Sequence, residues 1–120
     1  MSETPHLTVR NNQTASQYEL YAGRARLGLT QYQASERGLA FVHTEIAPEV
    51  GGEGLGSALV GAALDDARAR GLAVLPYCTF VRHFIETHPQ YLDLVPAGRR
   101  RSFGFDGELP GAAAPAGGEA

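Results

Sequence analysis

Several features that would point to common protein classes are absent from this chain. No uninterrupted apolar run is long enough to cross a bilayer. The single cysteine, Cys78, excludes an internal disulfide. Ten basic side chains against 13 acidic ones leave a net charge of −3, whereas binding to a nucleic-acid backbone needs a basic face. Residues 1–5 lack the basic and apolar regions of a signal peptide. Together these absences predict a soluble cytoplasmic protein with no membrane or nucleic-acid partner.

The composition fits one folded domain followed by a tail. Hydrophobic residues make up 43% of the 120 residues, which is enough for a packed interior. Residues 110–120 are almost entirely proline, glycine and alanine, and this low complexity predicts disorder. We therefore expect a single domain over residues 1–109 and a disordered tail over residues 110–120.

The first part of the chain has the pattern of short strands. Apolar and polar residues alternate in four stretches, which are separated by residues typical of turns. The stretches are residues 7–10, 18–21, 27–33 and 39–46, with a first turn over residues 11–13. Short strands with turns between them predict an antiparallel meander.

The period then becomes helical over residues 54–70, with Gly56 on the apolar face, where the helix is expected to press closely on a strand. Gly71 is placed to end the helix. Residues 72–77 form a fifth strand candidate. A strand–helix–strand order predicts that strands four and five run parallel. Pro76 cannot donate to a ladder, so the fifth strand should lie at an edge or part from its neighbour there.

Two further segments complete the prediction of a compact α/β fold. Thr79 is a candidate N-cap for a short helix over residues 80–88. Residues 91–95 are predicted to be extended.

A glycine-rich loop, Gly51-Gly52-Glu53-Gly54-Leu55-Gly56-Ser57, leads into the long helix. Glycines let backbone N–H groups approach a ligand, and the first turn of a helix adds unpaired donors, so this stretch can bind an anion such as phosphate. A Walker A loop is excluded because the chain contains no lysine. A Rossmann loop has a different glycine spacing and a parallel sheet before it. The alternative is a glycine-rich turn that only caps the helix.

Three motifs together resemble the small, single-domain GNAT-like family of acetyltransferases. They are His43-Thr44-Glu45-Ile46 before the loop, Gly54-Leu55-Gly56-Ser57 in it, and Pro76-Tyr77-Cys78-Thr79 after it. The resemblance extends over about residues 18–95. It implies a GNAT-like fold in which acetyl-CoA lies between parting strands four and five. Gly51 and Glu53 depart from the family motif, and the charge of Glu53 is expected to weaken cofactor binding.

The resemblance also implies which residues bind the cofactor. Backbone groups at the end of strand four would hold the pantetheine arm, and amides of the loop would hold the pyrophosphate. The candidates are Ile46, Ala47, Gly51, Gly52, Glu53, Gly54, Leu55, Gly56 and Ser57.

Acetyl transfer to an amine requires groups that take a proton from the amine and give one to the departing thiolate. Cys78 precedes a helix, and the resemblance implies that it faces the acetyl group. Its other interpretation is a small buried apolar side chain. Glu45 and His43 lie two residues apart and so share a strand face, on which Phe41 is also expected. His43 is therefore either an assistant to Glu45 or a packed core histidine.

The remaining polar features are less specific. His83 and His88 do not belong to a metal-ligand motif, so no metal site is predicted. Arg99, Arg100 and Arg101 either meet an acidic partner or the 3′-phosphate of CoA, or form a solvated face.

The sequence therefore predicts an acetyl-CoA-dependent N-acetyltransferase whose acceptor is a small-molecule or protein amine. The alternatives are an acyl-CoA-binding module without catalysis, and a structural domain. The oligomeric state stays open.

Overall fold

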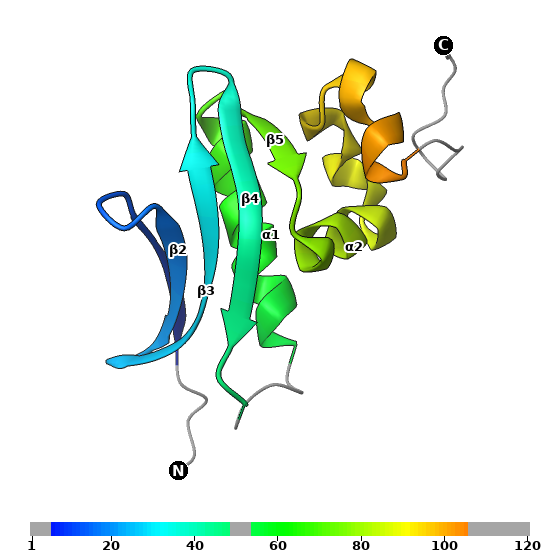
Figure 1. The fold of residues 1–120 in the computed structure, drawn as a ribbon. Helices are drawn as coiled ribbons and strands as arrows, with labels where there is room; N and C mark the ends of the chain where they lie inside the picture. The colour runs from blue at the N-terminus through cyan, green and yellow to red at the C-terminus, as the bar shows by residue number, and fades with distance from the viewer. Residues whose placement is uncertain (1–5, 49–53, 106–120) are drawn as a thin grey trace.

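The computed structural model describes residues 6–48 and 54–105, which form one mixed sheet covered on one face by helices (Figure 1). The strands are β1 (Leu7–Asn12), β2 (Gln17–Ala22), β3 (Ala25–Ala34), β4 (Gly38–Ile46) and β5 (Ala73–Pro76). Their spatial order is the order of the chain, β1-β2-β3-β4-β5. The first four pair antiparallel and β4 pairs parallel with β5, as predicted.

Helix α1 (Leu55–Ala69) crosses one face of the sheet, and α2 (Thr79–Thr87) follows β5 at its edge. The side of α1 that faces the sheet is fully buried at Leu59, Ala63 and Ala67. Tyr18 of β2 donates a hydrogen bond from its hydroxyl to Asp66 of α1 at 2.6 Å, so a hydrogen bond also joins the sheet to α1 on this side. Burial and this hydrogen bond raise the pKa of Tyr18. We call this side of the sheet the helix face.

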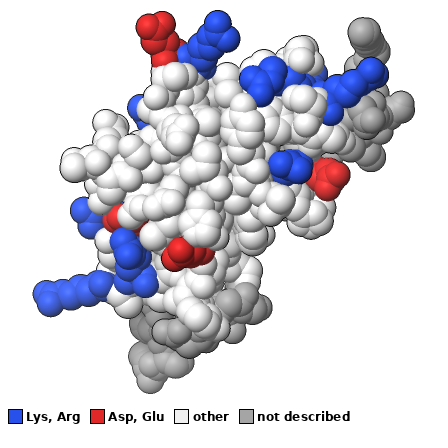
Figure 2. Space-filling view, in the orientation of Figure 1, with Lys and Arg blue, Asp and Glu red and all other residues white. Residues whose placement is uncertain are grey.

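The opposite side of the sheet, which we call the open face, has no helix over it in the described part of the chain (Figures 1 and 2). It still contains a buried carboxylate, Glu19, which is only 5% exposed. Glu19 accepts hydrogen bonds from Gln17 Nε2 at 2.6 Å, Asn12 Nδ2 at 3.0 Å and Tyr21 Oη at 2.9 Å. The hydrogen bond from Gln17 is the main reason that the pKa of Glu19 lies below its usual value. Buried charge is tolerated here because it is fully hydrogen-bonded.

Three local predictions were wrong. The first turn is at residues 13–16, and Asn12, the last residue of β1, accepts a hydrogen bond from the Ala15 amide at 3.2 Å. Cys78, not Thr79, is the N-cap of α2. Residues 91–95 do not form an extended segment, because Pro89–Leu94 is a 3₁₀ helix. Arg68 of α1 stabilises that helix through hydrogen bonds to both carboxylate oxygens of Asp93, at 2.8 and 3.0 Å.

Strand β4 contains a bulge in its pairing with β3. Gln31 pairs with His43 and the next residue, Tyr32, pairs with Phe41, so Val42 is an extra residue. A bulge of one residue reverses which face the following side chains point to. Phe41 therefore lies on the helix face, whereas His43 and Glu45 lie on the open face. The expectation that Phe41 shares their face was wrong.

Strands β4 and β5 part as predicted. Their parallel pairing ends where Phe41 meets Pro76, although β4 continues to Ile46. The Cys78 amide still donates to the Phe41 carbonyl at 2.8 Å. Among the described residues, this is the last backbone hydrogen bond between β4 and the segment that follows β5. β5 is an edge strand, which agrees with the position of Pro76.

Part of the sequence prediction lies outside the described residues. This holds for Gly51, Gly52 and Glu53 of the glycine loop and for the tail over residues 110–120. No helix in the described residues has the length and apolarity that crossing a membrane requires.

Candidate functional site

Where β4 and β5 part, the end of β4 has no neighbour on one side among the described residues. The Ala47 amide points the other way and donates to the Leu27 carbonyl at 2.7 Å. Because backbone groups along a strand alternate in direction, those of Ile46 and Thr44 point to the side that β5 has left. Ile46 was among the predicted cofactor residues. Thr44 was not, and the Ala47 amide is already used.

The N-terminus of α1 lies beside this stretch, and its first N–H groups point out of the helix. Its N-cap, Gly54, has a φ of 74°, which favours glycine. Among the described residues no side chain caps this helix, so the amides of Leu55, Gly56 and Ser57 have neither a helical nor a side-chain partner. These amides and the helix dipole form a site suited to an anion. Gly54 therefore has a conformational role in ending the loop as well as a place in the candidate site.

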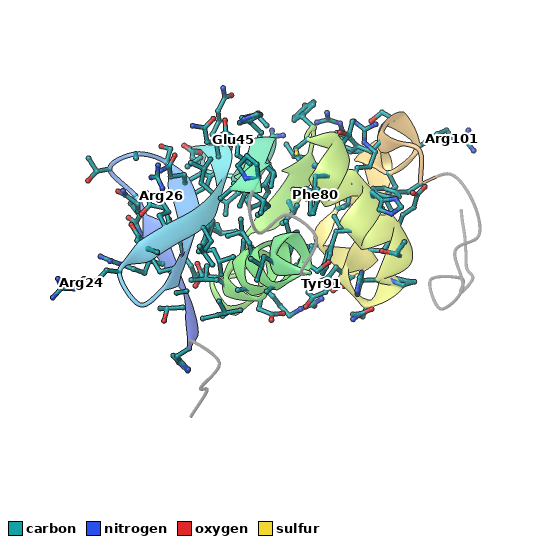
Figure 3. The ribbon with its side chains drawn as sticks, turned by 90° about the horizontal axis from the view of Figure 1, so that it is seen from below. Arg24, Arg26, Glu45, Phe80, Tyr91 and Arg101 are labelled. Carbon is teal, nitrogen blue, oxygen red and sulfur yellow. The ribbon has the colours of Figure 1, made fainter. Side chains whose placement is uncertain are left out.

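Gly56 is buried, but the neighbour that requires a glycine there belongs to a helix and not to a strand. A Cβ at Gly56 would lie 2.3 Å from Cζ of Phe80, the second residue of α2. The sequence predicted that Gly56 lets α1 approach a strand closely, but the atoms nearest to a Cβ at this position all belong to Phe80. Phe80 itself is 41% exposed at the surface where α1 and α2 meet (Figure 3).

Cys78 lies at the junction of the unpaired stretch and α2. It is 8% exposed and its Sγ is 3.3 Å from Oγ1 of Thr44. Thr44 in turn lies 2.8 Å from Oγ1 of Thr30 on β3. The sulfur is therefore hydrogen-bonded on the helix face of the sheet, which a purely apolar packing role does not require.

Glu45 and His43 contact each other on the open face. Nε2 of His43 lies 2.8 Å from Oε2 of Glu45, with side-chain exposures of 50% and 63%. This exposure rules out the interpretation of His43 as a packed core histidine. Figure 3 shows Glu45 directed away from α1. An ionised Glu45 can only accept, so Nε2 of His43 donates in this pair.

The structure thus assigns the three predicted catalytic residues to two groups. Glu45 and His43 form a pair on the open face, and Cys78 joins Thr44 on the helix face. Strand β4 separates the two groups at the point where β5 has parted. Thr44 is the residue that sequence reasoning missed. The sequence does contain a signal for the face on which Thr44 lies, because the apolar positions along β4 change from odd (Leu39, Phe41) to even (Ile46).

A basic surface lies beside β5. Tyr77, 47% exposed, accepts a hydrogen bond from Arg99 Nη2 at 2.8 Å. Arg99 also lines a cavity of about 110 Å³ together with Arg37 and the apolar side chains of Leu75 and Pro96. Within residues 6–48 and 54–105, no carboxylate forms an ion pair with Arg37 or Arg99.

The basic surface is at the beginning of β4, whereas the glycine loop follows the end of that strand. A nine-residue strand is about 30 Å long. The cavity at Arg37 and Arg99 is thus far from the expected pyrophosphate. This distance argues against the 3′-phosphate of CoA and leaves two interpretations for Arg99, an acidic partner and a solvated face.

Comparison with known proteins agrees with this arrangement. The sequence model of a family described as GCN5-related N-acetyl-transferase matches residues 17–94. No curated protein matches the chain. The matched range begins at the first residue of β2 and ends at the last residue of the 3₁₀ helix, so it includes β4, α1, β5 and Cys78.

Proposed function

The chain belongs to the GCN5-related N-acetyltransferases, and from that premise we propose that it transfers an acetyl group from acetyl-CoA to an amine. The observation that carries the proposal is the end of β4 beyond its pairing with β5, beside the N-terminus of α1, which no side chain of the described residues caps. The first offers backbone groups to an amide-containing arm, and the second offers N–H groups to a phosphate. Both features lie within the matched range.

The described residues fit acetyl-CoA in a specific way. Backbone groups of Thr44 and Ile46 would bind the pantetheine arm, and amides of Leu55, Gly56 and Ser57 would bind the pyrophosphate. Gly51, Gly52 and Glu53 stay predicted members of the same phosphate site. When bound, acetyl-CoA supplies the acetyl thioester.

The two groups of side chains suit the two proton transfers. On the open face, Glu45 takes the proton that the amine nitrogen loses, directly or through water, and His43 orients its carboxylate. On the helix face, the Cys78 thiol gives its proton to the CoA sulfur and regains one from solvent. The new C–N bond replaces the C–S bond. The amine loses one proton to Glu45 and the CoA sulfur gains one from Cys78, so the protons balance.

The acceptor in this proposal is an amine of a protein or long peptide that also has acidic residues some distance from the amine. Among the described residues, the cavities beside Glu45 and Arg99 measure about 190 and 110 Å³. Pockets that enclose small ligands are usually about 300–1,000 Å³, so an amine carried by a larger molecule fits these surfaces better. Arg37 and Arg99, about 25 Å from Glu45 along β4, would attract carboxylates of the acceptor that lie that far from the amine.

The alternative is an acyl-CoA-binding module without catalysis, and two measurements separate it from the enzyme. Calorimetry with acetyl-CoA tests binding, and absence of binding at millimolar concentration contradicts both. Mass spectrometry of lysine peptides incubated with acetyl-CoA tests transfer. Binding without transfer to any peptide or small amine leaves only the binding module. Cys78→Ala and Glu45→Gln should bind but transfer slowly, whereas Glu86→Gln, an exposed glutamate on α2, should behave like the wild type.

Acceptor charge can be tested by exchanging it on both partners. We expect Arg37→Glu to reverse the preference from long lysine peptides with aspartates about 25 Å from the lysine to peptides with arginines at that distance. Arg24→Glu, in the exposed turn between β2 and β3, is the matched control and should change nothing. Equal rates on both peptides with the wild-type chain would refute the acidic acceptor but not the transferase.

A further inference from the structure

Three hydrogen-bonding side chains lie in a line across the helix face of the sheet. Oγ1 of Thr30 on β3 is 2.8 Å from Oγ1 of Thr44 on β4. Oγ1 of Thr44 is 3.3 Å from Sγ of Cys78. The line ends at the N-cap of α2, on the segment that has left β4. The contact of Thr44 with Cys78 therefore crosses the gap where the backbone ladder has stopped.

The line is shielded from solvent at both ends. Thr30 is completely buried and Cys78 is 8% exposed, while Thr44 between them is half-buried. A buried hydroxyl needs a hydrogen-bond partner, and here each group supplies one for the next. The orientation of each group is thus fixed by its neighbour.

We infer that Thr44 is a positioning residue for Cys78, and that Thr30 orients Thr44; the inference rests on the proposed role of Cys78 in acetyl transfer. While Cys78 is a thiol, its S–H donates to Thr44. After Cys78 has given its proton away, the sulfur can only accept, so Thr44 donates to it and Thr30 donates to Thr44. The line can reverse direction without any side chain moving. Hydrogen bonds to an ionised sulfur are the stronger state, so the line stabilises the thiolate.

A cross-strand pair of threonines also occurs in sheets for stability alone. That alternative predicts that removal of the Thr44 hydroxyl changes the stability of the fold but not the chemistry of the sulfur. The two interpretations are separated by measuring the sulfur directly. The chain has one cysteine, so a thiol reagent reports on Cys78 only.

The experiment follows alkylation of Cys78 by iodoacetamide from pH 6 to 10, in the folded chain without acetyl-CoA. The reagent reacts with the thiolate. We expect Thr44→Val to react about tenfold more slowly at pH 7, the size of one lost hydrogen bond to a charged group, with the pH midpoint shifted upward. Thr44→Ser keeps the hydroxyl and should restore the wild-type profile. Thr79→Val, next to Cys78 but exposed, is the matched control.

Thr30→Val tests the second step and should slow alkylation by about two- to threefold, because it removes only the polarisation of Thr44. Thermal unfolding of each variant checks that the fold is kept, and Thr44→Ala replaces Thr44→Val if the latter unfolds. A wild-type alkylation profile in a folded Thr44→Val or Thr44→Ala variant would overturn the inference, as would a Thr44→Ser variant as slow as Thr44→Val. Alkylation of Cys78 needs no acetyl acceptor. Its result can therefore be interpreted even if the acetyl-transfer assays fail.

Discussion

Replacement of Gly56 by alanine separates the two roles that this glycine has in the structure. The added Cβ would lie 2.3 Å from Cζ of Phe80, so the ring has to leave its place. Phe80 is 41% exposed, which means that the ring can turn outward into solvent and that the backbone of α1 need not move. The cost is then limited to what the buried part of Phe80 contributes.

That cost can be worked from the exposure. Burial of a whole phenylalanine contributes about 1.5–3 kcal/mol, and rather more than half of Phe80 is buried, so loss of the contact costs about 1–2 kcal/mol. Alanine is favoured over glycine inside a helix by about 0.8–1 kcal/mol, which offsets part of it. Gly56→Ala should therefore destabilise the chain by about 0–1 kcal/mol.

A double-mutant cycle in urea gives the decisive comparison. In a Phe80→Ala background the clash is absent, so Gly56→Ala should stabilise by up to about 1 kcal/mol. The change of sign corresponds to a coupling energy of about 1–2 kcal/mol, within the range for residues in contact. If Gly56→Ala costs the same in both backgrounds, Phe80 is not the reason for the glycine and the reasoning is refuted.

The same variants distinguish packing from ligand binding. If Gly56 only accommodates Phe80, the double variant should bind acetyl-CoA as the Phe80→Ala variant does. If a bare backbone at Gly56 is also needed by the pyrophosphate, the double variant should be stable but bind more weakly. Calorimetry on the four chains of the cycle measures both results.

Glu19→Gln should destabilise the chain by about 1–3 kcal/mol at pH 7, because a buried charged acceptor of several hydrogen bonds is lost. The low pKa of Glu19 contributes stability above its unfolded value, and this is lost as the pH falls through the folded value. Urea unfolding at pH 7 and pH 3 should thus show a difference between the two chains that shrinks in acid. Glu45→Gln should lower kcat by about 10²–10⁴-fold while the KM for acetyl-CoA is unchanged, and an unchanged kcat would remove Glu45 as the base. Arg68→Ala should cost at most about 1 kcal/mol in thermal unfolding, since its pair with Asp93 is exposed, and a loss above 2 kcal/mol would contradict this.

The sequence was sufficient for the order of elements because each has a period of its own. Alternation over residues 39–46 and the helical period over residues 54–70 lie next to each other, and a proline ends the pairing of the fifth strand. These signals are local, so they are readable without tertiary contacts. The parallel pairing of β4 with β5 follows from their order alone.

The rest depends on contacts between distant residues. The 3₁₀ helix Pro89–Leu94 is held by Arg68 of α1, and the close neighbour of Gly56 is Phe80. Neither partner is visible in a local pattern. The candidate site was half predicted for the same reason: Cys78, Glu45 and His43 were found by their chemistry, but the assignment of each to a face of the sheet depends on one extra residue at Val42.

That extra residue has a consequence for insertions and deletions in β4. Before Val42, odd-numbered residues point toward the helices; after it, even-numbered residues do. Deleting Val42 would remove the bulge and leave Phe41 on the helix face and Glu45 on the open face. Deleting Thr44 instead, with the bulge kept, would turn Glu45 toward α1. Strand β4 is therefore expected to tolerate the loss of one residue at Val42 but not beyond it, whereas the turn at residues 13–16 can lengthen. A deletion scan across both segments, read by folding, would map this difference directly.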